Sequence, residues 1–160
     1  MLRLAVALVL FASPEMIPAD EGELLGRAAP EVSFQLADGK TSKLSDFKGK
    51  PVVLSFWASW CGPCRRELPA LAELAAQRPD VTFLAVNVDK DRPPAEQFIR
   101  ELKMAIPVVY DPQSSVMARF DVVVMPTMFM VDKNGTVKFR KSGFSIEHGL
   151  TELIAALGPK

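Results

Sequence analysis

The strongest constraint on this fold is an apolar strand that leads directly into a pair of cysteines. Residues 52–57, Val-Val-Leu-Ser-Phe-Trp, are nearly all apolar and begin with β-branched side chains, as is typical of a strand covered on both faces. Trp60-Cys61-Gly62-Pro63-Cys64 follows after two further residues, and leucines then recur at helical spacing up to Gln77. Open α/β sheets place their functional sites where such a strand ends and a helix begins. The sequence therefore predicts an α/β protein with its site at the cysteine pair.

The remaining chain alternates predicted strands and helices. The expected strands cover residues 32–36, 41–44, 81–88, 106–110, 127–131 and 136–139, and the expected helices cover residues 95–102, 114–120 and 146–157. Asp38-Gly39 is a turn signal between the first two strands, and Asn134-Gly135 predicts a type I′ turn between the last two. Of the 160 residues, 49% are hydrophobic, which suffices for one core. This order predicts a single layered α/β domain.

The first residues form a pattern of their own. Met1-Leu2-Arg3 is short and basic, Leu4 to Ala12 is apolar, and Ser13-Pro14 ends the run, as in a secretory signal peptide. The apolar run is much shorter than the roughly 20 residues that span a bilayer as a helix. We expect residues 1–19 to be a signal peptide or N-terminal anchor and residues 20–160 to be the domain, with a buried N-terminal strand as the alternative. Export would place the protein in the periplasm or otherwise outside the cytoplasm.

The cysteine pair has the position and spacing of a redox-active dithiol. Cys61 would lie at a helix N-terminus, where unpaired N–H groups and the helix dipole stabilise a thiolate, so Cys61 is the expected nucleophile. Cys64 lies in the first turn and is expected to resolve the mixed disulfide. A zinc site would need further ligands, but the chain has only two cysteines and one histidine, the distant His148. A structural disulfide between them would close too small a loop to stabilise much.

Several segments resemble known thioredoxin-fold proteins. Residues 56–65, Phe-Trp-Ala-Ser-Trp-Cys-Gly-Pro-Cys-Arg, are similar to the thioredoxin active-site segment. Met125-Pro126-Thr127 resembles the cis-proline loop, and Gly143 resembles the glycine before the last helix. The resemblance implies that Met125 and Pro126 bind an extended client segment, with Trp60 and Gly143 beside them.

A narrower resemblance is to the exported TlpA/ResA-like branch. It is carried by Arg65-Arg66-Glu67-Leu68-Pro69, by the early hairpin and by the helix and strand within residues 94–110. The resemblance implies a thioredoxin-like fold with a central mixed β-sheet flanked by helices, an N-terminal β-hairpin and an inserted helix-strand unit.

Glu67 is a third candidate catalytic residue. It follows Cys64 by three residues on the same helical face, where a carboxylate could raise the pKa of the resolving thiol and pass its proton. The alternative is a solvated carboxylate near a helix N-terminus. Thioredoxin has a buried aspartate beneath its cysteines, whereas this chain has Ser55. The resemblance to the TlpA/ResA-like branch implies that Glu67 is linked to the active site.

These observations predict a thiol-disulfide oxidoreductase that reduces disulfides of extracytoplasmic clients. The resemblance to the TlpA/ResA-like branch implies clients of the cytochrome c maturation or oxidase copper-site assembly type. A membrane electron-relay protein would act as its reductant. We expect a monomer with no metal and no cofactor beyond the Cys61–Cys64 disulfide. Nineteen basic and nineteen acidic residues balance, which disfavours a nucleic-acid partner.

Two other functions stay open. A disulfide oxidant or isomerase is the nearer alternative, although Gly-Pro between the cysteines resembles reducing thioredoxins. A non-enzymatic copper chaperone could use the two cysteines with a methionine, and Met125, Met128 and Met130 offer a possible soft-ligand patch. Alternating methionines on a covered strand are, however, expected to fill the core.

Overall fold

The computed structural model describes residues 24–36, 39–143 and 146–159. A seven-stranded sheet has the order β2-β1-β5-β4-β3-β6-β7. Its strands are β1 Ser33–Leu36, β2 Thr41–Lys43, β3 Val52–Trp57, β4 Thr82–Asn87, β5 Val108–Tyr110, β6 Thr127–Val131 and β7 Val137–Ser142. The helices are η1 Leu44–Phe47 (a 3-10 helix), α1 Cys64–Gln77, α2 Arg92–Leu102, α3 Ser115–Arg119 and α4 Ile146–Leu157. The predicted mixed sheet with flanking helices and an N-terminal hairpin is confirmed.

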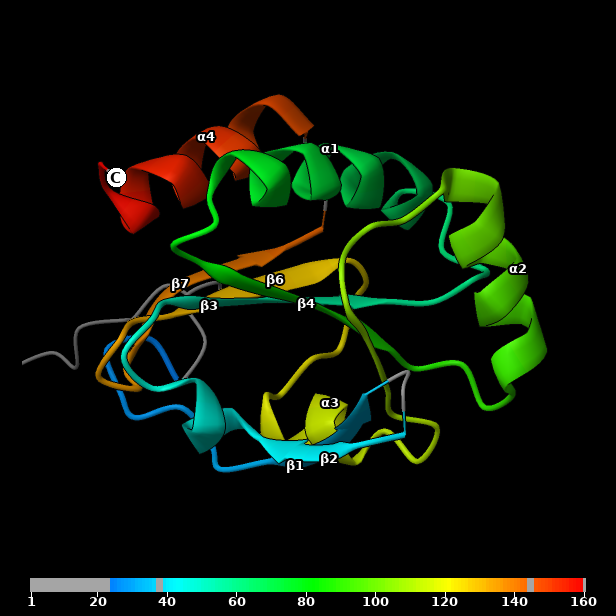
Figure 1. Ribbon diagram of the computed structural model, residues 1–160, viewed down its shortest axis with the longest axis horizontal. Coiled ribbons are helices and arrows are strands. Elements are labelled where there is room, and N and C mark those ends of the chain that lie inside the picture. Colours follow the sequence, from blue (N-terminus) through cyan, green and yellow to red (C-terminus); the bar gives the residue numbers. More distant parts are fainter. Residues whose placement is uncertain (1–23, 37–38, 144–145, 160) are drawn as a thin grey trace, which may run out of the picture.

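The central strand β3 lies between a parallel and an antiparallel neighbour. It pairs parallel with β4 and antiparallel with β6, and all six of its residues are buried. Helices α1 and α4 lie together over one face of the sheet, and α3 lies on the opposite side (Figure 1). Both faces of β3 are therefore covered, as its nearly continuous apolar sequence predicts.

The buried apolar residues form two clusters around the sheet. The one beneath α1 and α4 includes Val53, Leu71, Met128 and Leu153, all 1% exposed or less. The other brings aromatic rings together: Phe120 and Phe129 lie 5.0 Å apart, and Phe56 contacts both. Val52, Leu54 and Phe56 of β3 belong to the aromatic cluster and Val53 to the cluster beneath α1 and α4, so the strand that carries the cysteines packs on both sides.

The β6–β7 hairpin forms as predicted, but its turn is not type I′. Among the described residues of this turn only Gly135 has a positive φ, 89°, whereas a type I′ turn requires positive φ at both central residues. The Asp132 carboxylate instead accepts the N–H groups of Asn134 and Thr136, each at 2.9 Å. These side-chain hydrogen bonds hold the turn, and one glycine supplies the left-handed residue.

Two further expectations concern the first residue of α2 and the predicted leader. Helix α2 begins at Arg92, three residues earlier than expected, because Pro93 and Pro94 fit in a first turn that needs no backbone N–H. The predicted leader, residues 1–19, lies outside the described residues. Within the described part of the chain, no helix combines the length and apolar character that a membrane span requires.

Candidate active site

A disulfide joins Cys61 and Cys64 at the start of α1. The Cα atoms of the two residues are 5.4 Å apart, and the side chains are 4% and 0% exposed. The backbone N–H of Cys64 points at the Cys61 sulfur, with 3.2 Å between the nitrogen and the sulfur. This contact is what a helix N-terminus offers a thiolate once the disulfide is reduced. Of the two residues, Cys61 is the less deeply buried, and it is the one predicted to be the nucleophile.

Glu67 is buried beneath this end of α1, which excludes the alternative of a solvated carboxylate. Its side chain is 1% exposed, and the Ser55 hydroxyl on β3 donates a hydrogen bond of 2.6 Å to its Oε1 atom. Burial disfavours the charged form and raises the pKa of Glu67 from 4.5 to about 7, while the hydrogen bond from Ser55 lowers it. A carboxyl group with this pKa exchanges its proton near neutral pH.

The proline loop lies at the same edge of the sheet. The Met125–Pro126 peptide bond is cis, as the family resemblance implies. Because Phe56 pairs with Thr127, Pro126 lies beside the end of β3 from which the cysteine segment departs. The backbone N–H of Gly143 donates a hydrogen bond of 2.9 Å to the carbonyl of Pro126. The structure thus brings Pro126 and Gly143 together.

Apolar side chains near the disulfide are exposed. Trp60, which precedes Cys61, is 70% exposed, and Val123 and Val124, which precede the proline loop, are 85% and 46% exposed. Trp57 in contrast is fully buried, with its ring 4.9 Å from that of Phe98. Of the two tryptophans, only Trp60 can therefore meet a partner.

Sequence reasoning missed Asp89, which holds the loop before the cysteines. Its carboxylate accepts hydrogen bonds from the N–H of Ser59 at 2.9 Å, the Ser59 hydroxyl at 3.1 Å and the amide of Asn87 at 2.8 Å. The available signal was positional: β4 is parallel to β3, so residues after both strands meet at one edge of the sheet.

Helix α2, in the inserted unit, is attached to the active-site helix through Arg65. The Arg65 guanidinium lies 4.5 Å from the centre of the Phe98 ring and forms an ion pair of 2.8 Å with Glu101. Phe98 in turn packs on Trp57 at the end of β3. The insertion therefore buttresses the cysteine segment, a role that the sequence did not indicate.

Two of the three methionines considered as copper ligands lie in the core. Met128 and Met130 are buried in the cluster beneath α1 and α4, as expected of core residues. No group of three or more histidine, cysteine or acidic side chains in the described part of the chain could hold a metal ion.

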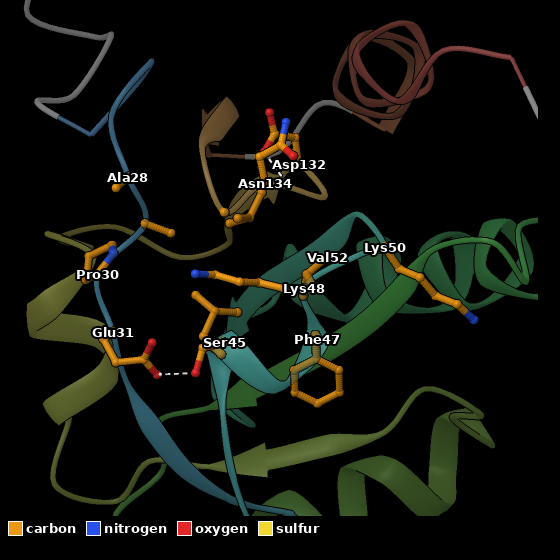
Figure 2. A pocket seen from close by; sticks show the side chains of 14 residues that line it. Ala28, Pro30, Glu31, Ser45, Phe47, Lys48, Lys50, Val52, Asp132 and Asn134 are labelled. Carbon is orange, nitrogen blue, oxygen red and sulfur yellow. Dashed lines mark hydrogen bonds between the residues drawn. The ribbon is translucent and has the colours of Figure 1, made fainter.

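A pocket of about 100 Å³ lies at the opposite end of β3, where Val52 begins the strand (Figure 2). Its rim includes Lys48 and Glu31, and the carboxylate of Glu31 accepts a hydrogen bond of 3.2 Å from the Ser45 hydroxyl. None of the predicted site residues lines this pocket. It is therefore separate from the cysteine site.

Comparisons with known proteins point to the same chemistry. Residues 24–156 match the family model described as Redoxin. A thiol-disulfide oxidoreductase ResA from Geobacillus thermodenitrificans is 34% identical over 137 residues, covering 84% of this chain and 79% of the relative.

Solved structures include a protein assigned as the thiol:disulfide interchange protein DsbE from Chlorobium tepidum. It has a TM-score of 0.77 at 34% identity and covers 84% of this chain and 98% of its own. A secreted disulfide oxidoreductase from Mycobacterium tuberculosis has a TM-score of 0.69 at 25% identity and covers 79% and 93%.

Proposed function

This chain belongs to the Redoxin family as a ResA-like thiol-disulfide oxidoreductase, and from this premise we propose that it reduces disulfides of client proteins outside the cytoplasm. The observation that carries the proposal is the Cys61–Cys64 disulfide at the start of α1, one helical turn before the buried carboxyl of Glu67 on the same helix. The signal-peptide pattern and the similarity to a secreted oxidoreductase support the extracytoplasmic location.

In the proposed reaction the dithiol form gives two electrons to the client disulfide. The Cys61 thiolate attacks one client sulfur, which forms a mixed disulfide and releases the first client thiolate. Cys64 loses its proton and attacks the Cys61 sulfur, which forms the Cys61–Cys64 disulfide and releases the second client thiolate. A dithiol of a membrane electron-relay protein then reduces the enzyme again.

Glu67 is the proposed acceptor of the Cys64 proton. Both residues lie on the buried face of α1, one turn apart, and both are 1% exposed or less. Neither residue is open to bulk solvent, and a carboxyl with a pKa of about 7 can take the proton and later release it.

The proline loop is the proposed client-binding strand. The structure records no hydrogen bond between the backbone of Met125 and any other described residue, so its N–H and C=O groups can pair with an extended client segment. Trp60 and Val124, both exposed, would flank that segment. The client classes we propose are apocytochrome c thiols awaiting haem and copper-site cysteines of an oxidase subunit.

The equilibrium reduction potential of the Cys61–Cys64 pair tests this function. We expect a value more negative than about −220 mV, in the range of reducing thioredoxins and glutaredoxins. A value near −120 mV would instead indicate a disulfide oxidant. A Cys64→Ser variant should accumulate mixed disulfides with reductase clients, and a Cys61→Ser variant is the matched control because it lacks the attacking thiol.

A further inference from the structure

The Glu67 carboxyl group is held by a single hydrogen bond to the central strand. Ser55 lies in the middle of β3, is fully buried, and donates its hydroxyl hydrogen to Glu67 Oε1 at 2.6 Å. Among the described residues, it is the only hydrogen bond that joins a side chain of β3 to a side chain of α1. The hydroxyl therefore determines how the carboxyl is oriented.

The second carboxyl oxygen has no partner. Glu67 Oε2 is buried and makes no hydrogen bond with any described residue. A buried oxygen without a donor is costly as part of a carboxylate, so a proton on this atom is favoured while the disulfide is present.

Among the described residues, no charged side chain contributes to the pKa shift of this carboxyl group. The neighbours of Ser55 in the sheet are Ala85 on β4 and Met128 on β6. On α1 the buried residues are Cys64, Leu68, Leu71 and Leu74, while Arg65, Arg66 and Glu73 are exposed. Burial and the Ser55 hydroxyl are the influences that move the pKa of Glu67.

We propose that Ser55 is a positioning residue for thiol-disulfide exchange: its hydroxyl engages Glu67 Oε1 and thereby leaves Oε2 as the atom that receives the proton of Cys64. This inference rests on the proposed role of Glu67 in the reductase. When the Cys64 S–H bond breaks, the sulfur keeps the electron pair and attacks the Cys61 sulfur, and the proton goes to Oε2. The Ser55 hydrogen bond stabilises the carboxylate that must be present beforehand.

The test is the reaction of the reduced protein with the chromogenic disulfide DTNB, followed by stopped flow from pH 5 to 9. The first equivalent of released thiolate reports the attack by Cys61, and the second reports the attack by Cys64. In Ser55→Ala the lost donor leaves Glu67 protonated at neutral pH. We expect the second step to slow about fivefold at pH 7 and its pH midpoint to rise by about one unit, with the first step unchanged.

A matched variant and a direct readout separate positioning from a general loss of structure. Ser55→Thr keeps the hydroxyl and should restore the second step and its pH midpoint. The infrared band of the protonated Glu67 carboxyl, assigned by its loss in Glu67→Gln, should persist to a higher pH in Ser55→Ala than in the wild type.

The outcomes distinguish this inference from the proposed function. If the wild type reduces DTNB and Glu67→Gln slows the second step, but Ser55→Ala changes neither the pH midpoint nor the infrared titration, the role of Ser55 is wrong while the function stands. If Glu67→Gln leaves the second step unchanged, Glu67 is not the proton acceptor and the Ser55 inference falls with it. A reduction potential in the range of strong disulfide oxidants overturns the reductase alone.

Discussion

The backbone N–H of Gly143 donates a hydrogen bond of 2.9 Å to the carbonyl oxygen of Pro126. This contact joins the end of β7 to the proline loop, so two residues predicted to bind the client are held together by backbone alone. Gly143 has a φ of +72°, a conformation that strains any residue with a Cβ atom. The positive φ is therefore the reason that this position needs glycine. Lack of space is not the reason, since a Cβ there would meet no atom within 4 Å.

Gly143→Ala should destabilise the protein by about 1 kcal/mol and slow the reduction of protein clients. Gly158→Ala is the matched control, because Gly158 has the same φ and equally open space but lies after α4. Chemical denaturation gives the stability of both variants, and an insulin-reduction assay gives the activity. Equal activity losses in the two variants would show that the proline loop does not depend on Gly143.

The raised pKa of Glu67 predicts a pH-dependent stability for the disulfide form. In the unfolded chain the group ionises near 4.5, and in the folded protein near 7. The stabilising contribution is complete below about pH 4.5 and is lost as the pH rises through about 7, because only the unfolded state releases the proton in that interval. The loss amounts to about 3 kcal/mol.

Glu67→Gln should remove this slope, since the amide does not titrate and its oxygen can still accept from Ser55. Glu73→Gln, an exposed position on the same helix, should leave the slope intact. Unfolding free energies at pH 5 and pH 8 without reductant provide the comparison. A slope that survives in Glu67→Gln would mean that another group titrates.

Asp89→Asn should loosen the loop before Cys61. The substitution places an NH₂ donor among groups that already donate to this side chain, at a cost of about 2 kcal/mol. Asp111→Asn is the matched control: Asp111 also accepts three hydrogen bonds, from the N–H and hydroxyl of Ser115 and the N–H of Met117. Amide hydrogen exchange should rise at Ser59 only in the Asp89 variant, and equal exchange at Ser59 in both variants would contradict this role.

Trp60→Ala should impair the reduction of protein clients without affecting stability. The side chain is 70% exposed, so the free energy of unfolding should change by less than about 0.5 kcal/mol. Reduction of a small disulfide such as DTNB should proceed at the wild-type rate, since it needs no extended docking surface.

The buried Trp57 serves as the contrast. Trp57→Ala should lower the free energy of unfolding by about 3–5 kcal/mol, because it leaves a cavity in the core where the Trp57 ring packs on Phe98. If Trp60→Ala slowed both substrates equally, Trp60 would act on the disulfide itself rather than on client docking.

Local patterns in the sequence sufficed for the strands and helices around the cysteines. The apolar run of β3 and the leucine spacing of α1 each reflect burial by neighbours on known faces, so their bounds match the structure closely. The β6–β7 turn was mispredicted because the Asp132 side chain competes with the backbone for N–H groups, an effect that an Asn-Gly signal does not contain.

The cysteine chemistry was predictable, whereas the groups that support it were less so. Spacing on a helix predicts that Glu67 shares a face with Cys64. Whether that face is exposed to solvent or buried depends on how the helix packs against the sheet. The loop hydrogen bonds of Asp89 join residues 30 positions apart and follow only from the parallel pairing of β3 with β4. Long-range pairing of this kind is not encoded in local periodicity.

The contact between Ser55 and Glu67 also has a consequence for protein design. A hydroxyl from the strand and a carboxyl from the helix meet across one interface, so the acid could be supplied from either side. The double exchange Ser55→Asp with Glu67→Ser would keep one group of each kind while moving the acid to the strand. Such a chain would show whether disulfide exchange depends on which element carries the acid, or only on one being present.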